Sequence, residues 1–108
     1  MSKISIEQFF EAELKSAKIL EAERIEKSKK LVKLQVDLGD EHRQIVAGIA
    51  EAYNAEDLVG KTIIIVANLE PATLMGEVSE GMLLAGSLDG VPILATFDKE
   101  IPPGTKVK

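Results

Sequence analysis

The chain has 108 residues, 45% of them apolar and 29% charged, which fits one globular domain over residues 1–108 and excludes an intrinsically disordered chain. It has no cysteine, so disulfides, thiolate metal sites and cysteine nucleophiles are excluded. The net charge of −5 argues against nucleic acid, but residues 27–43 hold five basic and three acidic side chains, so one basic segment remains.

The N-terminal segment does not have the pattern of a signal peptide, because it carries acidic side chains early and lacks a long apolar run. The longest apolar run, residues 63–67, is far too short to cross a bilayer. The absence of cysteine fits a reducing compartment. We therefore expect a cytoplasmic protein without membrane contact.

Residues 4–13 predict a short helix, with Ser5 as its N-cap and Gln8 completing a capping box. The helix would place Ile6, Phe9 and Phe10 on one face, which packs either on the core of the domain or on a second copy of the chain. Residues 14–26 then predict a long strand. Its apolar alternation changes phase after Ile19, which indicates a β-bulge or a sharp bend.

The remaining elements are mostly strands separated by turn signals. Alternation is clearest in residues 31–38, and a turn at residues 39–41 joins them to a strand over residues 42–50. A short helical segment is expected over residues 51–59. Further strands are expected over 61–69, 82–87 and 91–97, with a loop over 73–81, a hairpin turn at Asp89-Gly90 and an end of ordered structure at residues 102–104.

This order predicts an all-β fold of one particular plan. A bent first strand, a hairpin, a helical connection and two more strands make a five-stranded OB-fold barrel, with a short N-terminal helix, a helical segment between strands three and four, and a C-terminal hairpin. An SH3-like barrel and a small sandwich have similar strand patterns and remain alternatives.

Few residues suggest catalysis or a metal. The single histidine, His42, stands beside two acids at a turn, where a solvated side chain is the ordinary interpretation. The segment around Ser79 comes near a nucleophile elbow, but its first glycine lies three residues before the serine instead of two. Gly60-Lys61-Thr62 lacks the upstream glycine of a phosphate-binding loop. We expect a non-catalytic protein with no cofactor and no metal.

A run of lysines over residues 27–33 is the strongest functional signal in the residues themselves. Lys30 enters the cleanest strand, Lys33 lies on its polar face, and Arg43 belongs to the partner strand. Lysine neutralises phosphates with little base selectivity, and the second and third strands of an OB-fold commonly face nucleic acid. No aromatic residue lies between Phe10 and Tyr53, which favours recognition of backbone and shape over base stacking. A merely solvated lysine-rich turn is the alternative.

Several short blocks, in this order and spacing, resemble the tRNA-binding domain family. They are Lys30-Leu31, Val36-Asp37-Leu38-Gly39, Arg43-Gln44-Ile45-Val46-Ala47-Gly48-Ile49, Leu58-Val59-Gly60-Lys61, Val66-Ala67-Asn68-Leu69-Glu70-Pro71 and Ser79-Glu80-Gly81-Met82-Leu83-Leu84-Ala85. The family includes C-terminal domains of methionyl-tRNA synthetases and free-standing structure-specific tRNA-binding proteins. The resemblance covers essentially the whole chain.

The resemblance implies an OB-fold, a homodimer, and binding to the outer corner of tRNA, with an aminoacyl-tRNA synthetase as a further partner. It implies tRNA contacts by Lys30, Lys33, Asn68, Ser79 and Met82, to which the strand pairing adds Arg43. Loop capping is the alternative role for Asn68, and core packing is the alternative for Met82.

Two other functions remain open at this stage. Some small relatives of the family resemble export-associated chaperones, which bind peptides in an apolar groove. The chain could also serve only as a dimerisation module for a larger enzyme, in which case the isolated chain binds no RNA.

Overall fold

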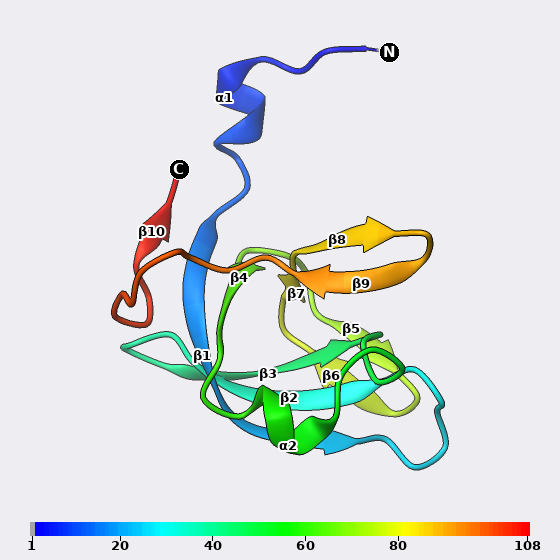
Figure 1. The fold of residues 1–108 in the computed structure, drawn as a ribbon. Helices are drawn as coiled ribbons and strands as arrows, with labels where there is room; N and C mark the ends of the chain where they lie inside the picture. Colours follow the sequence, from blue (N-terminus) through cyan, green and yellow to red (C-terminus); the bar gives the residue numbers. More distant parts are fainter. Residues whose placement is uncertain (1) are drawn as a thin grey trace.

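The computed structural model describes residues 2–108 as an all-β unit with two one-turn helices (Figure 1). The helices are α1 (Ile6–Phe9) and α2 (Ala55–Leu58). The strands follow in chain order as β1 (Leu14–Arg24), β2 (Val32–Asp37), β3 (His42–Ala47), β4 (Thr62–Val66), β5 (Ala72–Leu74), β6 (Glu77–Ser79), β7 (Met82–Leu83), β8 (Ala85–Leu88), β9 (Val91–Leu94) and β10 (Lys106–Val107). The all-β prediction is confirmed.

The main sheet is organised around β1. Its strands run in the order β3-β2-β1-β4-β7, and β10 also pairs with β1. Residues 18–24 of β1 pair with β2, whereas residues 14–18 pair with β4, all antiparallel. One long strand therefore serves two neighbours in turn, and the sheet curls into a half barrel (Figure 1).

The predicted phase change in β1 is confirmed as a β-bulge. The pairing register with β2 shifts between Ile19 and Glu21, so Leu20 is the extra residue and is 38% exposed. Ala17 and Ile19 are buried before the bulge, and Ala22 packs against the core after it. A bulge of this kind bends the strand, which lets β1 take part in both halves of the curled sheet.

The core lies inside the curl and is aliphatic. Val32, Leu34 and Val36 alternate along β2 and are fully buried, as the alternation predicted. Ile45 of β3 and Leu58 of α2 are also fully buried. Each such side chain contributes about 1.5–3 kcal/mol through burial, so the inward face of β2 fixes the pairing register and leaves its outward face for polar residues.

The N-terminal helix is shorter than expected but begins as predicted. Ser5 and Gln8 form both bonds of the capping box, Gln8 N to Ser5 Oγ at 3.1 Å and Ser5 N to Gln8 Oε1 at 2.8 Å. The apolar face stays outside, with Ile6 62% and Phe10 52% exposed. Of the two expected partners for this face, the domain's own core is therefore excluded.

Three predictions for the C-terminal half are wrong. Residues 73–81, expected as a loop, belong to a hairpin of β5 and β6. The expected strand 82–87 is divided, because the chain pairs with β4 through β7 and then turns away to form a separate hairpin of β8 and β9. Order continues past residues 102–104, since β10 pairs with the start of β1.

Candidate nucleic-acid interface

A loop held by several hydrogen bonds carries most of the lysine run. We call residues 25–31, which join β1 to β2, the lysine loop. Ser28 Oγ accepts hydrogen bonds from the backbone N–H groups of Lys30 at 3.2 Å and Leu31 at 3.1 Å. The Arg24 guanidinium donates to the carbonyl oxygens of Lys29 at 3.3 Å and Ala50 at 3.4 Å. These bonds hold the loop from both sides, so its ammonium groups extend from a fixed backbone.

Lys30 lies in the lysine loop, two residues before β2, and Lys33 is the second residue of β2. Lys30 is exposed, and its carbonyl oxygen accepts from the N–H of Ala50 at 2.9 Å, which fixes it to the segment after β3. Lys33 extends from the outward face of β2, and its side chain is 25% exposed. Its Nζ lies 3.6 Å from Oε2 of Glu77 on β6. Each lysine is thus held by a different part of the fold, and Lys33 already has a carboxylate partner.

The outward wall of β2 and β3 is polar beyond Lys33. Gln35 Nε2 donates to Gln44 Oε1 at 2.9 Å, and Gln44 Nε2 donates to the carbonyl oxygen of Val78 at 2.8 Å. The second contact brings β6 against this wall. Lys33 therefore lies where the β2–β3 wall meets the β5–β6 hairpin.

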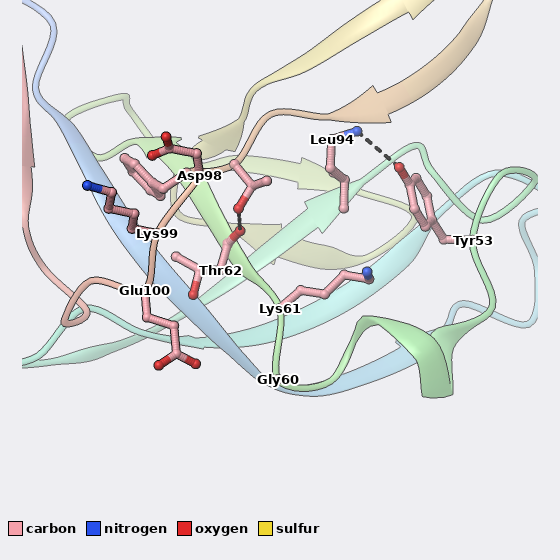
Figure 2. A pocket seen from close by; sticks show the side chains of 10 residues that line it. Tyr53, Gly60, Lys61, Thr62, Leu94, Asp98, Lys99 and Glu100 are labelled. Carbon is pink, nitrogen blue, oxygen red and sulfur yellow. Dashed lines mark hydrogen bonds between the residues drawn. The ribbon is translucent and has the colours of Figure 1, made fainter.

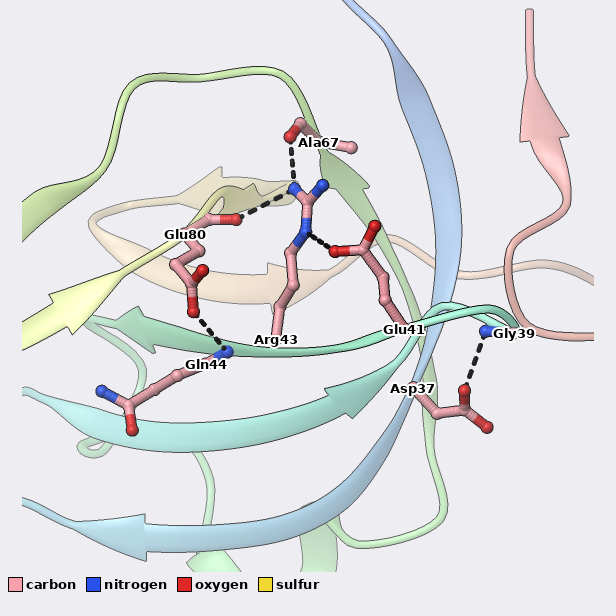
Figure 3. Close-up of polar contacts among 7 residues, drawn as sticks. All are labelled: Asp37, Gly39, Glu41, Arg43, Gln44, Ala67 and Glu80. Carbon is pink, nitrogen blue, oxygen red and sulfur yellow. Dashed lines mark hydrogen bonds and ion pairs between the residues drawn. The ribbon is translucent and has the colours of Figure 1, made fainter.

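Arg43 lies on the other side of the sheet from Lys33. It pairs with Val36, whose side chain is in the core, and its guanidinium points toward Ala67, just after β4 (Figure 3). Nε donates to Glu41 Oε1 at 2.6 Å, and Nη1 donates to the carbonyl oxygens of Ala67 and of Glu80, the latter at 3.3 Å. The structure does not bring Arg43 together with the lysines.

The hydrogen-bonded pair of Arg43 and Glu41 shifts the pKa of both side chains. The hydrogen bond from Arg43 holds the pKa of the Glu41 carboxyl below its usual value, because it favours the charged form. The same bond raises the pKa of Arg43, against a smaller opposing effect of burial. Together with the contacts to Ala67 and Glu80, this pair fixes the ends of β3, β4 and β6 to one another.

Ser79 is buried, with 4% of its surface exposed. Its Oγ accepts from the N–H of Val46 at 2.9 Å and donates to the carbonyl oxygen of Gly81 at 2.9 Å. Both functions of the hydroxyl are therefore used inside the protein, where they hold β6 against β3. Direct contact between Ser79 and RNA stays a prediction.

The Asn68 side chain makes hydrogen bonds within the protein, whereas the Met82 side chain is exposed. Asn68 Oδ1 accepts from the N–H of Glu13 at 2.8 Å, and its Nδ2 donates to the carbonyl oxygen of Glu11 at 2.7 Å. The side chain thus caps the N-terminal segment, in agreement with the loop-capping alternative. Met82 is 51% exposed, so it does not follow the core-packing alternative. An exposed, flexible apolar side chain is available for contact with another molecule.

Sequence reasoning missed three residues that shape this surface, namely Arg24, Gln44 and Glu77. Alternation along β3 carries a usable signal for Gln44, because it places that residue on the face opposite to Arg43. Glu77 pairs with Lys33 of a strand far away in the chain, and Arg24 donates to Ala50, 26 residues away. Nothing in the local sequence marks these partners.

A separate cavity of about 430 Å³ lies beneath the β8–β9 hairpin (Figure 2). Its polar groups hold the hairpin in place: the Tyr53 hydroxyl accepts from the N–H of Leu94 at 3.1 Å, and Thr96 Oγ1 donates to the carbonyl oxygen of Thr62 at 2.7 Å. The remaining charged groups are of both signs, as with Lys61 and Asp98. This mixed rim does not favour either an anion or a cation.

The described residues do not contain a metal centre. No group of three or more His, Cys, Asp or Glu side chains within residues 2–108 could hold a metal ion. His42 is largely exposed, and its Nε2 lies 3.8 Å from Oδ1 of Asp37. None of the helices in this part of the chain is long and apolar enough to span a membrane.

Comparison with known proteins identifies the family. The profile of a family described as "Putative tRNA binding domain" matches residues 14–106. The chain belongs to this family. The resemblance drawn from the short sequence blocks is thus confirmed over most of the chain.

The relatives of this tRNA-binding domain are large enzymes and small proteins. It is 53% identical to methionine–tRNA ligase 1 of Bacillus anthracis over 98% of its own length, and 56% identical to methionine–tRNA ligase of Thermotoga maritima over 96%. It spans only 16% of the length of either ligase.

Two solved structures match the domain along nearly all of both chains. The MetRS-related protein from Pyrococcus horikoshii has a TM-score of 0.95 at 38% identity and is covered over 100% of each chain. The chaperone CsaA from Bacillus anthracis has a TM-score of 0.91 at 30% identity, with 99% of this chain and 100% of that chain covered.

Proposed function

We propose that the chain is a non-catalytic module that binds tRNA by its folded shape, through the lysine loop and Lys33. The observation that carries the proposal is that Lys33 extends from the outward face of β2, directly after a hydrogen-bonded loop that carries Lys27, Lys29 and Lys30. Ammonium groups act as point charges toward phosphates, so a fixed set of them selects a spacing of phosphates and not a base sequence. Membership of the family supports the same ligand.

We divide the six candidate residues into two groups. Lys30 and Lys33 would contact phosphates, and Met82 would contact a base or a sugar. Arg43, Asn68 and Ser79 would act as positioning residues, since their polar atoms already hold the segments around the site. Substitution of the first group should change affinity without changing the fold, and substitution of the second group should change both.

An OB-fold would support the assignment of Lys33 to the RNA-binding face. We infer that residues 1–108 form a single OB-fold domain, in which β1, β2, β3, β4 and β7 supply the five strands of the barrel. The antiparallel order β3-β2-β1-β4-β7 and the bulged first strand support the inference. In OB-folds the face of strands two and three is a common site for oligonucleotides, which is where Lys33 lies.

We further propose that the domain is a homodimer. The apolar face of α1 and the side chains of Leu88, Val91 and Ile93 on the β8–β9 hairpin are exposed, and these elements extend from the upper side of the sheet in Figure 1. Two copies joined there would bury these side chains and offer two lysine loops to one RNA. A sedimentation coefficient that stays at the monomer value across micromolar concentrations would contradict this proposal.

The context of the module follows from its relatives. We propose that it works in the cytoplasm, either free-standing or as the C-terminal appendage of a methionyl-tRNA synthetase. The high identity to methionine–tRNA ligases supports the second arrangement, and the full-length match to small solved proteins supports the first.

A gel-shift comparison tests the binding proposal. Intact tRNA should bind more tightly than unstructured RNA of equal length, and the Lys30→Glu/Lys33→Glu double variant should lose tRNA binding while circular dichroism shows the fold unchanged. Equal binding of both RNAs would contradict recognition by shape. Undiminished binding by the double variant would move the site away from these lysines.

A chaperone-like peptide-binding function is the second candidate, because the fold matches the CsaA chaperone closely. It would use an apolar surface, so binding of a peptide would depend weakly on salt, whereas binding to phosphates weakens steeply as salt rises. Titration of tRNA and of an unfolded polypeptide at two salt concentrations distinguishes the two. A module that only dimerises would bind neither ligand.

A further inference from the structure

The tip of the β5–β6 hairpin has an unusual residue for its backbone. Met75 and Gly76 both have positive φ, at 52° and 82°. The β8–β9 hairpin has the same turn, with Asp89 at 51° and Gly90 at 82°. Asp and Gly suit such two-residue turns, because aspartate and glycine tolerate the left-handed region. Methionine does not share this tolerance, so the chain uses a favourable residue at one turn and an unfavourable one at the other.

Nothing in the surroundings of Met75 compensates for its backbone conformation. A non-glycine residue in the left-handed region is destabilised unless a short polar side chain bonds locally, and burial could offset that effect. Met75 is 56% exposed, so burial does not offset it. Backbone outliers that persist without compensation are concentrated at functional sites. The exposed methionine at this tip is therefore a candidate for contact with a ligand.

The hairpin is held beside Lys33 by hydrogen bonds to β3. Glu80 N donates to the carbonyl oxygen of Gln44 at 2.8 Å, and Gln44 Nε2 returns a bond to the carbonyl oxygen of Val78. The Lys33–Glu77 contact of 3.6 Å places β6 directly next to Lys33. An RNA held by Lys33 would therefore lie within reach of the hairpin.

The charge of this hairpin decides which part of an RNA could meet it. Residues 69–82 contain three glutamates and no lysine or arginine, so this segment repels phosphates. Its exposed large apolar side chains are Leu69, Leu74, Met75, Val78 and Met82. An RNA docked with phosphates on the lysines would have to present an uncharged surface here, and the uncharged surface of RNA is the face of a nucleobase.

We propose that Met75 packs on the face of a nucleobase at an end or interruption of the base stack, in the RNA that Lys30 and Lys33 hold by its phosphates. This inference rests on the proposed function and adds a second, uncharged contact to it. A flexible thioether fits the flat face of any base, so the contact reads shape and not sequence.

The variant Met75→Asn tests the proposal, because asparagine suits the left-handed backbone and removes the apolar side chain. It should raise the urea midpoint of unfolding while it weakens tRNA binding about fivefold to tenfold, at the lower end of the range for one stacked base. The slope of log affinity against log salt should stay unchanged, since no phosphate contact is lost. Val59→Asn removes an equally exposed apolar side chain beside α2 and should bind tRNA like the unaltered protein.

The outcomes separate this inference from the proposed function. Wild-type affinity in Met75→Asn, or an equal loss in Val59→Asn, would overturn the contact of Met75 while tRNA binding itself stands. A change in sedimentation without a change in tRNA affinity would assign the tip to a protein contact, which also overturns it. If the unaltered chain binds tRNA no better than unstructured RNA of equal length, the proposed function falls and the inference falls with it.

Discussion

Glu77 is expected to weaken tRNA binding, because its carboxylate is paired with the Lys33 ammonium group in the free protein. Its Oε2 lies 3.6 Å from Lys33 Nζ, and the two side chains are 36% and 25% exposed. Ion pairs at this degree of exposure contribute about 0.2–1 kcal/mol. A phosphate must displace the carboxylate or share the ammonium group with it. Removal of the carboxylate should therefore improve the free energy of binding by up to about 1 kcal/mol, which is about fivefold in affinity.

The assay compares Glu77→Gln with the unaltered protein by fluorescence anisotropy of labelled tRNA at two salt concentrations. Glu100→Gln is the matched control, because it makes the same change of net charge at an exposed site on the rim of the cavity in Figure 2. Glu77→Gln should bind more tightly than this control, with the larger gain at low salt. Its urea midpoint should change little. Equal affinities for the two variants would refute the reasoning that Glu77 competes for Lys33.

Three further predictions concern the residues that position the site. Ser79→Ala removes the buried hydroxyl bonded to Val46 N and Gly81 O, so it should lower the free energy of unfolding by about 1–3 kcal/mol, measured by urea denaturation; an unchanged midpoint would contradict the positioning role. Gly81→Ala should also lower the free energy of unfolding, because residues other than glycine rarely adopt a φ of 145° and an added Cβ would lie 2.9 Å from Val66 O. An unchanged urea midpoint would contradict this prediction. Glu41 has a lowered pKa when folded, so its bond to Arg43 stabilises at neutral pH and that stability is lost as pH falls through the folded pKa. The difference in urea midpoint between the unaltered protein and Glu41→Gln should therefore shrink on acidification, and a constant difference would contradict this.

Periodicity and turn chemistry predicted the parts of the fold that depend on neighbours in sequence. The buried alternation of β2, the bulge at Leu20, the capping box at Ser5 and the turn at Asp89-Gly90 are all local patterns. The β5–β6 hairpin was missed because Met75 stands where such a turn normally has Asn, Asp or Gly. The unusual residue at this turn therefore hid the hairpin in the sequence.

Elements that depend on distant partners could not be predicted in the same way. The two residues of β10 are ordered because Ser16, which is fully buried, donates from its Oγ to Pro102 O and accepts from Thr105 N, both at 2.9 Å. Nothing in residues 102–108 indicates that partner.

The candidate site divides along the same line. The lysine loop is a local cluster and was visible in the sequence. The inward direction of Arg43 follows from its pairing with Val36, and the burial of Ser79 follows from the docking of β6 on β3. The directions of Arg43 and Ser79 both depend on strand pairing between distant segments. Their residue types alone therefore suggested contacts with RNA, whereas both side chains make hydrogen bonds within the protein.

We propose that Lys30 and Lys33 together bind phosphates of a folded RNA. The salt dependence of tRNA affinity tests it most directly, with the unaltered protein compared to the Lys30→Gln/Lys33→Gln double variant. Loss of two phosphate contacts should reduce the slope of log affinity against log salt by roughly 1.5 to 2. The same slope in both proteins would contradict the account.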